Sequence, residues 1–388
     1  MKREIKENRV ALTGGAAAAE ALRQINPDVM PVYPITPQTP IIETFAKFEA
    51  KKKVDTDVIT VESEHSAISA CVGSSAAGAR TVTATSSQGL ALMNEILYIT
   101  SGMRLPVMML VSARALSAPI NIHGDHSDVM GAKDAGWIQI FSEDAQEVYD
   151  NTIIGMKLAE KVKVPVMVVM DGFVTSHSVE NLKTLHDRSV RMFVGEYKPK
   201  DALLNVKKPH TFGPVSLPNS YFEFKLDQQE AILNSIDEFE SIADQFADLS
   251  GRHYDVFENY QAADADHVIV AAGSVCGGVK DTVDKLRMKG KKVGLLKIKM
   301  FRPFPYKRIA KILSKAKTIA VLDKSMAFGS VPPMYGEIVM SANLADHKSR
   351  ISSYVYGLGG RDVFTKDIEK VFDDLAKGRK FRGVNYIK

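Results

Sequence analysis

The chain has 388 residues, of which 45% are hydrophobic and 25% are charged, and its formal net charge is +4. This composition is typical of a globular protein that is long enough for two domains. Because basic and acidic residues are mixed along the chain, we expect no nucleic-acid partner. The longest apolar runs, such as residues 164–170, have the length of strands, so we expect no membrane span and no membrane partner.

Two further features bound the function. The N-terminal stretch is charged and lacks an apolar signal core, which predicts a cytoplasmic protein. The two cysteines, Cys71 and Cys276, are far apart in the sequence. They exclude a disulfide scaffold, a structural zinc site and a self-contained iron–sulfur cluster, all of which need more thiolates. Any redox metal would therefore lie on another chain.

The first half of the chain alternates short apolar runs with helical patterns. Strands are predicted at 29–35, 58–61, 81–85, 107–113 and 165–172, and helices at 41–53, 66–79, 89–103 and 147–162. Valine-rich strands separated by helices predict a parallel sheet that is covered on both faces. Ligands bind such sheets at the carboxyl ends of the strands. The residues of interest therefore follow the strands: Thr36, 62–65, 86–89, 113–128 and 171–177.

The alternation stops between about residues 180 and 260, where 207–224 is rich in proline and aromatic residues. We expect a long connection that lies on another surface of the protein. Strands at 267–274, 292–300, 318–325 and 351–359 then predict a second, smaller α/β domain. The expected division is 1–250 and 251–388. The sequence GSVCGG at 273–278 lacks the glycine spacing of a dinucleotide site, which favours an ordinary strand-to-helix turn.

Residues 32–41, VYPITPQTPI, place a rigid turn after the first of these strands. Proline fixes its own φ and restrains the residue before it, so Thr36 between Ile35 and Pro37 would hold its hydroxyl in one direction, toward a ligand. The alternative is that Pro37 starts a helix and Thr36 caps it.

Glu62 and Glu64 lie where the second of these strands meets a helix of small residues. One interpretation is a cap or a partner of the helix dipole. The other is a carboxylate in an apolar cleft, where lost hydration raises the pKa so that the group can share a proton with a ligand's ring nitrogen.

Arg114 follows a buried strand, where a guanidinium is suited to a bidentate grip on a carboxylate. The alternative is a structural ion pair with Asp125 or Asp128. These aspartates, with His123 and His126, form an H-G-D-H-S-D cluster that has the look of a metal site, but the spacing is a weak signal. We expect these side chains to brace the loop, and we expect no metal site on this chain.

Six motifs together resemble the α subunit of the 2-oxoacid:ferredoxin oxidoreductase family, most closely the pyruvate:ferredoxin type. They are LTGGAAAAEAL, YPITPQT, ESEHSAISA, TATSSQGLALM, SARALSAPINIHGDHSD and DGFVTSHSVE, and VLDKSMAFGS extends the similarity toward the C-terminus. The motifs follow the family's order and spacing over nearly the whole chain.

The resemblance implies an α/β fold in which a parallel-sheet, pyrimidine-type domain for thiamine diphosphate precedes a smaller transketolase-C-like α/β domain. It implies a site shared with a β subunit that holds the diphosphate and Mg²⁺. It also implies [4Fe-4S] clusters on partner chains such as γ and δ subunits, with ferredoxin as electron acceptor. The chain lacks a G-D-G motif with a following asparagine for magnesium diphosphate, which agrees with this division of labour.

The resemblance also implies roles for particular residues. Thr36 and Arg114 would hold the keto and carboxylate oxygens of the substrate, and Glu64 would bond the aminopyrimidine nitrogen of the cofactor; Glu62 has no such role. Further cofactor contacts are expected from Pro34, Ile35, Ser87, Gln88 and Gly89.

The implied reaction is the reversible oxidative decarboxylation of pyruvate with coenzyme A to acetyl-CoA and CO₂. The alternatives are another substrate, either a branched-chain 2-oxoacid or 2-oxoglutarate, or a non-catalytic regulatory subunit. One departure from the family is Gly14-Gly15, where it usually has Gly-Asn, so any contact that the asparagine side chain makes is in doubt.

Overall fold

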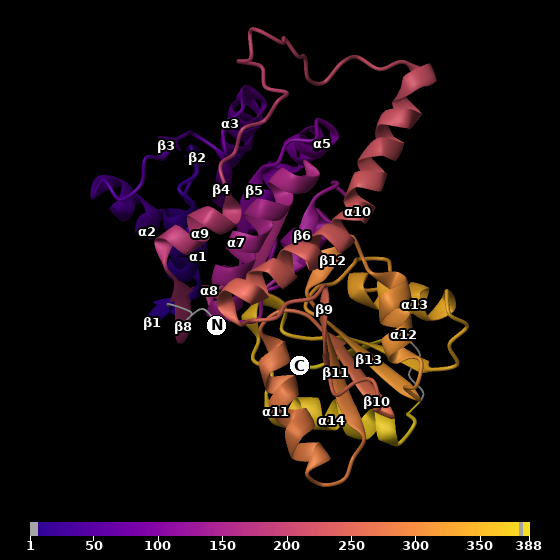
Figure 1. The fold of residues 1–388 in the computed structure, drawn as a ribbon. Helices are drawn as coiled ribbons and strands as arrows, with labels where there is room; N and C mark the ends of the chain where they lie inside the picture. The colour runs from indigo at the N-terminus through magenta and orange to yellow at the C-terminus, as the bar shows by residue number, and fades with distance from the viewer. Residues whose placement is uncertain (1–6, 380–382) are drawn as a thin grey trace.

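The computed structural model describes residues 7–379 and 383–388. Residues 1–6, on which part of the cytoplasmic expectation rests, lie outside this range. The chain forms two α/β units, drawn in indigo to magenta and in orange to yellow in Figure 1. No helix in the described part of the chain combines the length and the hydropathy needed to cross a bilayer.

The first unit contains eight strands and ten helices within residues 7–250. The strands are β1 Glu7–Thr13, β2 Val29–Val32, β3 Asp57–Thr60, β4 Val82–Thr85, β5 Met108–Ala113, β6 Ile138–Phe141, β7 Val166–Asp171 and β8 Val179–Leu185. The helices are α1 Gly14–Ile25, α2 Thr39–Ala50, α3 Glu64–Ala77, α4 Ser87–Leu92, α5 Asn94–Gly102, α6 Ser127–Gly131, α7 Ala145–Val162, α8 Val174–His177, α9 Asp187–Val194 and α10 Pro218–Ser250.

The central sheet of this unit has the strand order β12-β6-β7-β5-β4. Every residue of β5 and β7 is buried, which is why their sequences are almost continuously apolar. The parallel pair β2-β3 continues the sheet beyond β4 through a bridge between Val29 and Thr81. β2, β3, β4, β5 and β7 run in the same direction, so their carboxyl ends lie along one edge, which we call the carboxyl edge.

The second unit contains the remaining strands and helices. The strands are β9 Phe257–Tyr260, β10 His267–Ala271, β11 Val293–Ile298, β12 Met300–Arg302, β13 Thr318–Asp323, β14 Arg350–Val355 and β15 Val384–Tyr386. The helices are α11 Val275–Arg287, α12 Tyr306–Leu313, α13 Pro333–Asn343, the 3₁₀ turn η1 Leu358–Gly360 and α14 Thr365–Ala376. Its six-stranded sheet has the order β15-β14-β13-β10-β11-β9, and only β9 runs antiparallel.

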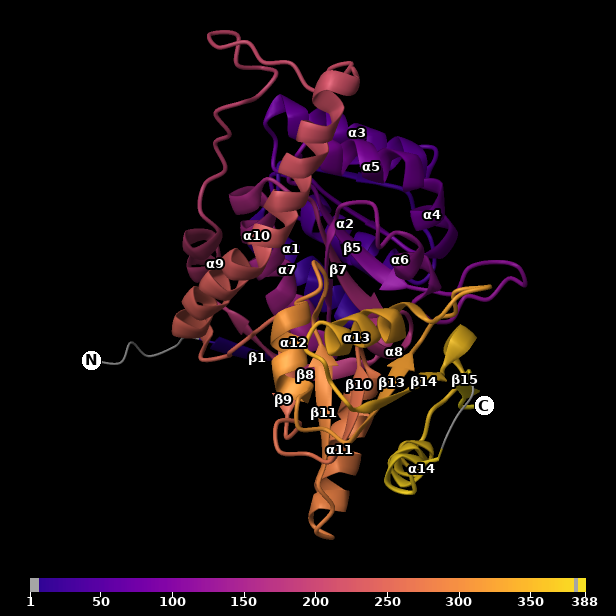
Figure 2. The same cartoon turned by 90° about the vertical axis from the view of Figure 1, so that its right-hand side faces the viewer.

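The units are joined by a strand as well as by the chain. β12 belongs by sequence to the second unit, but it pairs antiparallel with β6 at the edge of the first unit's sheet. In Figure 2 the two units therefore form one continuous body rather than two separate lobes.

We expected one long irregular connection over residues 180–260, but most of this range forms regular helices and strands. β8 pairs with β1, and α10 is a helix of 33 residues that packs on α7. Only residues 195–217 form an irregular strap, which runs from α9 to the far tip of α10 (Figure 1). The buried residues of α10 begin at Ser235. Its first half extends outward and meets the body only through partial contacts near α5, such as those of Asp227 and Gln228, so no single apolar stripe marks the helix in the sequence.

Candidate functional site

Three chemically distinct groups lie at the carboxyl edge. Thr36 follows β2, Glu64 is the first residue of the helix after β3, and Arg114 directly follows β5. The Nη1 group of Arg114 donates a hydrogen bond of 2.9 Å to the backbone oxygen of Thr36. The structure thus places Thr36 and Arg114 in direct contact, with Glu64 on the neighbouring connection.

The turn around Thr36 is held by Gln38 rather than by a helix start at Pro37. The backbone N–H of Gln38 donates to the oxygen of Ile35 at 3.0 Å, and its side-chain amide donates to the oxygen of Tyr33 at 2.9 Å. Since α2 begins at Thr39 with Gln38 as N-cap, the cap alternative for Thr36 is wrong. Pro34 and Thr36 are exposed, and the Thr36 hydroxyl has no partner among the described residues. It is free to bind a ligand.

Glu64 is buried, with 7% of its surface exposed, although nothing in the helix start requires it. Ser63 caps α3 by accepting from the N–H of Ser66 at 3.2 Å. The exposed Glu62 accepts from the hydroxyl of Ser66, which lowers the pKa of Glu62. The Glu64 carboxylate, in contrast, has no hydrogen-bond or ion-pair partner in the described part of the chain. A buried carboxylate without a partner is costly, so this group is suited to a ligand that brings a donor.

The stretch Ser87–Gly89 packs against Glu64 and against the connection after β5. A Cβ atom on Gly89 would lie 2.7 Å from Oε1 of Glu64, so the carboxylate rests on the bare glycine backbone. The Ser87 hydroxyl donates to the oxygen of Ala115 at 2.5 Å, and Gln88 is exposed and accepts from the N–H of Ser117 at 3.1 Å. The nearby hydroxyls of Thr85 and Ser86 are buried and have no hydrogen-bond partner among the described residues, so they could donate to a bound group.

Arg114 is buried, with 6% of its surface exposed, and no carboxylate of residues 7–379 or 383–388 forms an ion pair with its guanidinium. Its Nε donates to the oxygen of Asn121 at 2.9 Å, and together with the bond to Thr36 this bond fixes the plane of the guanidinium. In the described residues, no carboxylate forms an ion pair with the guanidinium, and Nη2 has no hydrogen-bond partner. The alternative of an ion pair with Asp125 or Asp128 is therefore wrong. A desolvated guanidinium with unused donors is suited to an anionic ligand.

Asp128 braces the loop, as predicted, but sequence reasoning missed which groups it binds. Its carboxylate accepts from the backbone N–H of Ser87 at 2.7 Å and of Arg114 at 2.9 Å, and so ties the ends of β4 and β5 together. Burial raises the pKa of Asp128 to about 7, against the opposing effect of these hydrogen bonds. Its place in the H-G-D-H-S-D cluster predicted a side chain that braces the loop, but the cluster does not reveal that the groups bound are these two backbone N–H groups.

The other side chains of the H-G-D-H-S-D cluster brace the loop, as predicted. Asp125 accepts from the N–H of Gly359 at 3.1 Å, and Nε2 of His126 lies 2.5 Å from Oδ1 of Asp171. The His123 ring lies against that of Phe173, with 5.1 Å between centroids. In Figure 2 this loop lies over the second unit.

Elsewhere, Glu143, Glu147 and Glu258 bring carboxylates together at the spacing of a metal site. The ammonium groups of Lys280 and Lys297 already lie within 2.9 Å of these carboxylates. The cluster is therefore an ion-pair network between the two units.

The departure at Gly14-Gly15 leaves the start of α1 intact, because Thr13 caps the helix by accepting from the N–H of Ala16 at 3.1 Å. A Cβ atom on Gly15 would lie 3.0 Å from Cβ of Pro40, so a side chain there would need α2 to shift slightly.

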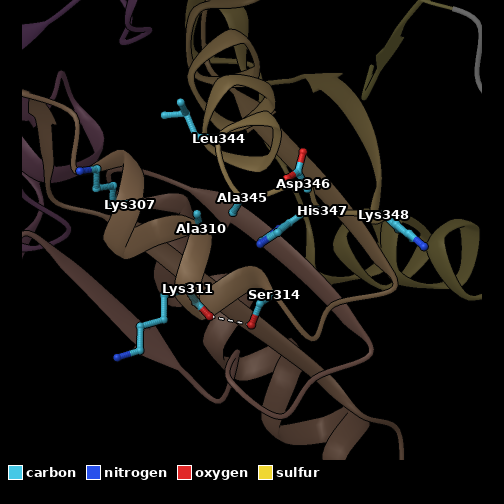
Figure 3. A pocket seen from close by; sticks show the side chains of 9 residues that line it. All are labelled: Lys307, Ala310, Lys311, Ser314, Leu344, Ala345, Asp346, His347 and Lys348. Atoms are coloured by element: carbon cyan, nitrogen blue, oxygen red, sulfur yellow. Dashed lines mark hydrogen bonds between the residues drawn. The ribbon is translucent and has the colours of Figure 1, made fainter.

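A surface groove of about 590 Å³ lies between α12 and the segment 344–348 of the second unit (Figure 3). Figure 3 shows Lys307, Lys311 and Lys348 pointing away from it. The groove thus offers no convergent positive charge, and none of the predicted site residues lines it.

The fold and the site agree with the comparison to known proteins. Residues 20–244 match the family model described as pyruvate flavodoxin/ferredoxin oxidoreductase, thiamine diphosphate-binding, and residues 265–368 match core domain II of pyruvate:ferredoxin oxidoreductase. The chain belongs to this family of 2-oxoacid oxidoreductases, and the fold class expected from the sequence is confirmed.

Two curated relatives illustrate the similarity. The chain is 51% identical over 372 residues to the pyruvate synthase subunit PorA of Thermotoga maritima. The aligned region covers 95% of each of the two chains. It is 40% identical over 375 residues to the ketoisovalerate oxidoreductase subunit VorA of Pyrococcus furiosus, which covers 96% of this chain and 95% of that one.

Among solved structures, a 2-oxoglutarate:ferredoxin oxidoreductase from Magnetococcus marinus, with 2-oxoglutarate, coenzyme A and succinyl-CoA bound, has a TM-score of 0.77 at 20% identity. The match covers 96% of this chain, which spans 65% of that neighbour's length. This likeness concerns the fold.

Proposed function

We propose that the chain is the α subunit of a pyruvate:ferredoxin oxidoreductase and supplies one side of a thiamine diphosphate site. The observation that carries the proposal is the buried Arg114 guanidinium, which lies against Thr36, with the buried Glu64 on the adjacent connection; within the described part of the chain, neither charged group has an ion-pair partner. We also propose residues 1–250 as the pyrimidine-type domain and 251–388 as the transketolase-C-like domain.

The residues at the carboxyl edge fit the pyrimidine end of this cofactor. Glu64 would accept a hydrogen bond from the protonated ring nitrogen, which would give this buried carboxylate the partner that the described residues do not supply. Pro34, Ile35, Ser87, Gln88 and Gly89 would form the wall around the ring. When bound, thiamine diphosphate supplies a carbanion that attacks the keto carbon and stabilises the charge left by decarboxylation.

Arg114 and Thr36 would act on the substrate. The free donors of the guanidinium would hold the carboxylate, and the Thr36 hydroxyl would donate to the keto oxygen, so that both ends of the 2-oxoacid are oriented before reaction. A regulatory subunit would have no use for unpartnered acidic and basic groups at one edge, which favours the catalytic interpretation.

Pyruvate is the favoured substrate because relatives with higher identity are named pyruvate synthase subunits. Arg114 would grip any 2-oxoacid carboxylate, so the ketoisovalerate and 2-oxoglutarate reactions remain the second candidates. The wall that sets side-chain size would be shared with a partner chain.

The remaining components would lie on other chains. We propose a β subunit that holds the diphosphate and Mg²⁺, and further subunits, such as γ and δ, whose [4Fe-4S] clusters pass electrons to ferredoxin, with coenzyme A as acyl acceptor. Both cysteines of this chain are fully buried, which supports placing the clusters elsewhere. A cytoplasmic location is part of the same proposal.

The test is to copurify the complex from its native host and to assay pyruvate, 2-oxoisovalerate and 2-oxoglutarate with coenzyme A and a low-potential dye. We expect the highest kcat/KM with pyruvate. In the same complex, Arg114→Ala should raise KM for the best substrate at least about tenfold, the scale of a lost charge-assisted hydrogen bond. An unchanged KM, or a chain that purifies alone as a monomer, would contradict the proposal.

A further inference from the structure

Asp171 is a buried carboxylate for which the proposed reaction has no direct use. It is the last residue of β7 and pairs with Ala113, the residue before Arg114. The side chain is 1% exposed and accepts hydrogen bonds from four donors. His126 Nε2 lies at 2.5 Å and Lys324 Nζ at 3.1 Å. Ser274 supplies the other two, its backbone N–H at 3.0 Å and its hydroxyl.

These donors come from both units and from the loop that carries Arg114. Lys324 directly follows β13, and Ser274 directly precedes α11. His126 ends the loop that begins at Arg114, and its backbone N–H also donates to the oxygen of Lys324 at 2.8 Å. Asp171 is thus the point at which the loop, the first unit's sheet and the second unit meet.

The loop in turn orients the guanidinium. Arg114 Nε donates to the oxygen of Asn121, and Asn121 is held by its own amide, which donates to the oxygen of Gly359 at 3.0 Å. The loop also folds back on the end of β5, because the Ala115 N–H donates to the oxygen of His123 at 3.1 Å. The path from Asp171 to Arg114 therefore runs through the His126 bond, along the chain from His126 back to His123 and Asn121, and through the bonds of these two residues to Ala115 and Arg114.

The electrostatics keep Asp171 charged. Burial alone would raise the pKa of this carboxyl, but Lys324, His126 and the bond from Ser274 outweigh burial and hold the pKa well below its usual value. The turn at Gly273 is shaped for this carboxylate, because its φ is +75° and a Cβ there would lie 3.0 Å from Oδ1 of Asp171. The N-terminus of α11 is therefore closed by a protein carboxylate.

We propose that Asp171 is a positioning residue that, through His126, holds the loop 114–126 at the junction of the two units and so keeps Arg114 in the orientation that binds the substrate carboxylate. The inference rests on the proposed role of Arg114. If Asp171 acts in this way, the contact between the two units contributes to the affinity for the substrate.

The test measures steady-state kinetics of the assembled complex with Asp171→Asn. We expect KM for the 2-oxoacid to rise about tenfold or more, with a smaller change in kcat, because a misplaced guanidinium binds its carboxylate poorly. Hydrogen exchange of residues 115–127 should also become faster. A matched control is Asp150→Asn, which removes the charge of an equally buried carboxylate bonded to Arg252, away from the carboxyl edge; we expect it to lower stability but leave KM unchanged.

A double-variant cycle separates this inference from the proposed function. If Asp171 acts through Arg114, Asp171→Asn should change KM less than twofold in an Arg114→Ala background. If Arg114→Ala leaves KM unchanged, the proposed function fails. If Arg114→Ala raises KM but Asp171→Asn does not, the positioning role alone is overturned.

Should Asp171→Asn prevent assembly, His126→Ala supplies the test. It removes the link to the loop but leaves the Lys324 and Ser274 bonds to Asp171, and the same rise in KM is expected. An unchanged KM in this variant would overturn the proposal.

Discussion

At the scale of single residues, the site is marked by polar groups that the protein does not use for itself. Glu62 and Glu64 are two residues apart on the same turn, but Glu62 is exposed and bonded to Ser66, whereas Glu64 is buried and unpartnered. Arg114 is likewise buried, and among the residues that the structure describes neither Arg114 nor Glu64 has an ion-pair partner. Folding alone gives no reason to retain such groups, since each costs stability.

Gly89 should be needed for the position of Glu64. In Gly89→Ala the new Cβ would lie 2.7 Å from Oε1 of Glu64 and 2.5 Å from the Thr85 hydroxyl, so the carboxylate must move. We expect kcat of the assembled complex to fall by about one to two orders of magnitude, approaching the loss of two or more orders expected for Glu64→Gln.

The matched control for this prediction is Gly73→Ala in α3, the helix that carries Glu64. A Cβ on Gly73 meets nothing within 4 Å, so this variant should keep full activity. If both alanine variants were equally active, the contact with Gly89 would have no role in positioning Glu64.

At this scale the sequence predicted which residues gather at the strand ends, but it left their partners open. Whether Arg114 pairs with Asp128 depends on the path of the loop 114–126 between them, and spacing in the sequence does not determine that path. For the same reason the sequence predicted that Asp128 braces the loop but not which backbone groups it binds.

At the scale of elements, α10 was not predicted because only its second half has buried residues, and a helix is recognised in a sequence by its buried apolar face. Its second half follows α7 and buries Phe239, Ile242 and Phe246, whereas its first half carries exposed aromatic residues such as Phe222. The parallel strands were predicted because their buried runs are unmistakable. The projecting half of α10 has no such face, and the prolines of the strap before it suggested a loop.

The two halves of α10 should respond differently to truncation of a phenylalanine. Phe239 is fully buried, so Phe239→Ala should lower the free energy of unfolding by about 3–5 kcal/mol. Phe222 is 71% exposed, and Phe222→Ala should change the stability of the chain little. Denaturant unfolding of both variants checks this, and equal losses would show that the projecting half is packed in solution.

At the scale of the whole molecule, buried ion pairs hold the two units against each other. Glu147 of α7 accepts from Lys297 and Lys299 at 2.8 Å each. Burial opposes ionisation of this glutamate, but the two ammonium groups outweigh burial and lower its pKa from 4.5 to about 2. The sequence could not predict this network, because its members are about 150 residues apart and share no motif.

Because of this network, the free energy of unfolding should decrease at acidic pH. Because the pKa of Glu147 is lower in the folded state, its contribution is present above pH 4.5 and is lost as the pH falls toward 2. Glu147→Gln should therefore destabilise the protein by about 3 kcal/mol at pH 7, and by less at pH 3.

Denaturant unfolding at both pH values measures the difference between the variant and the parent. The comparison variant is Glu369→Gln, which removes an exposed ion pair with Lys285 and should have little effect at either pH. A destabilisation by Glu147→Gln that is equal at pH 7 and pH 3 would argue against the ion pairs as its cause.

The short strand β12 has a consequence for dissecting the protein. It follows residue 250 in the chain but completes the hydrogen bonding of β6, so a fragment ending at 250 would expose the backbone of an apolar strand that is normally covered. Such an open edge invites pairing with other chains. Expression of the N-terminal portion by itself should consequently yield aggregates, and appending a segment that carries Met300–Arg302 is the minimal remedy.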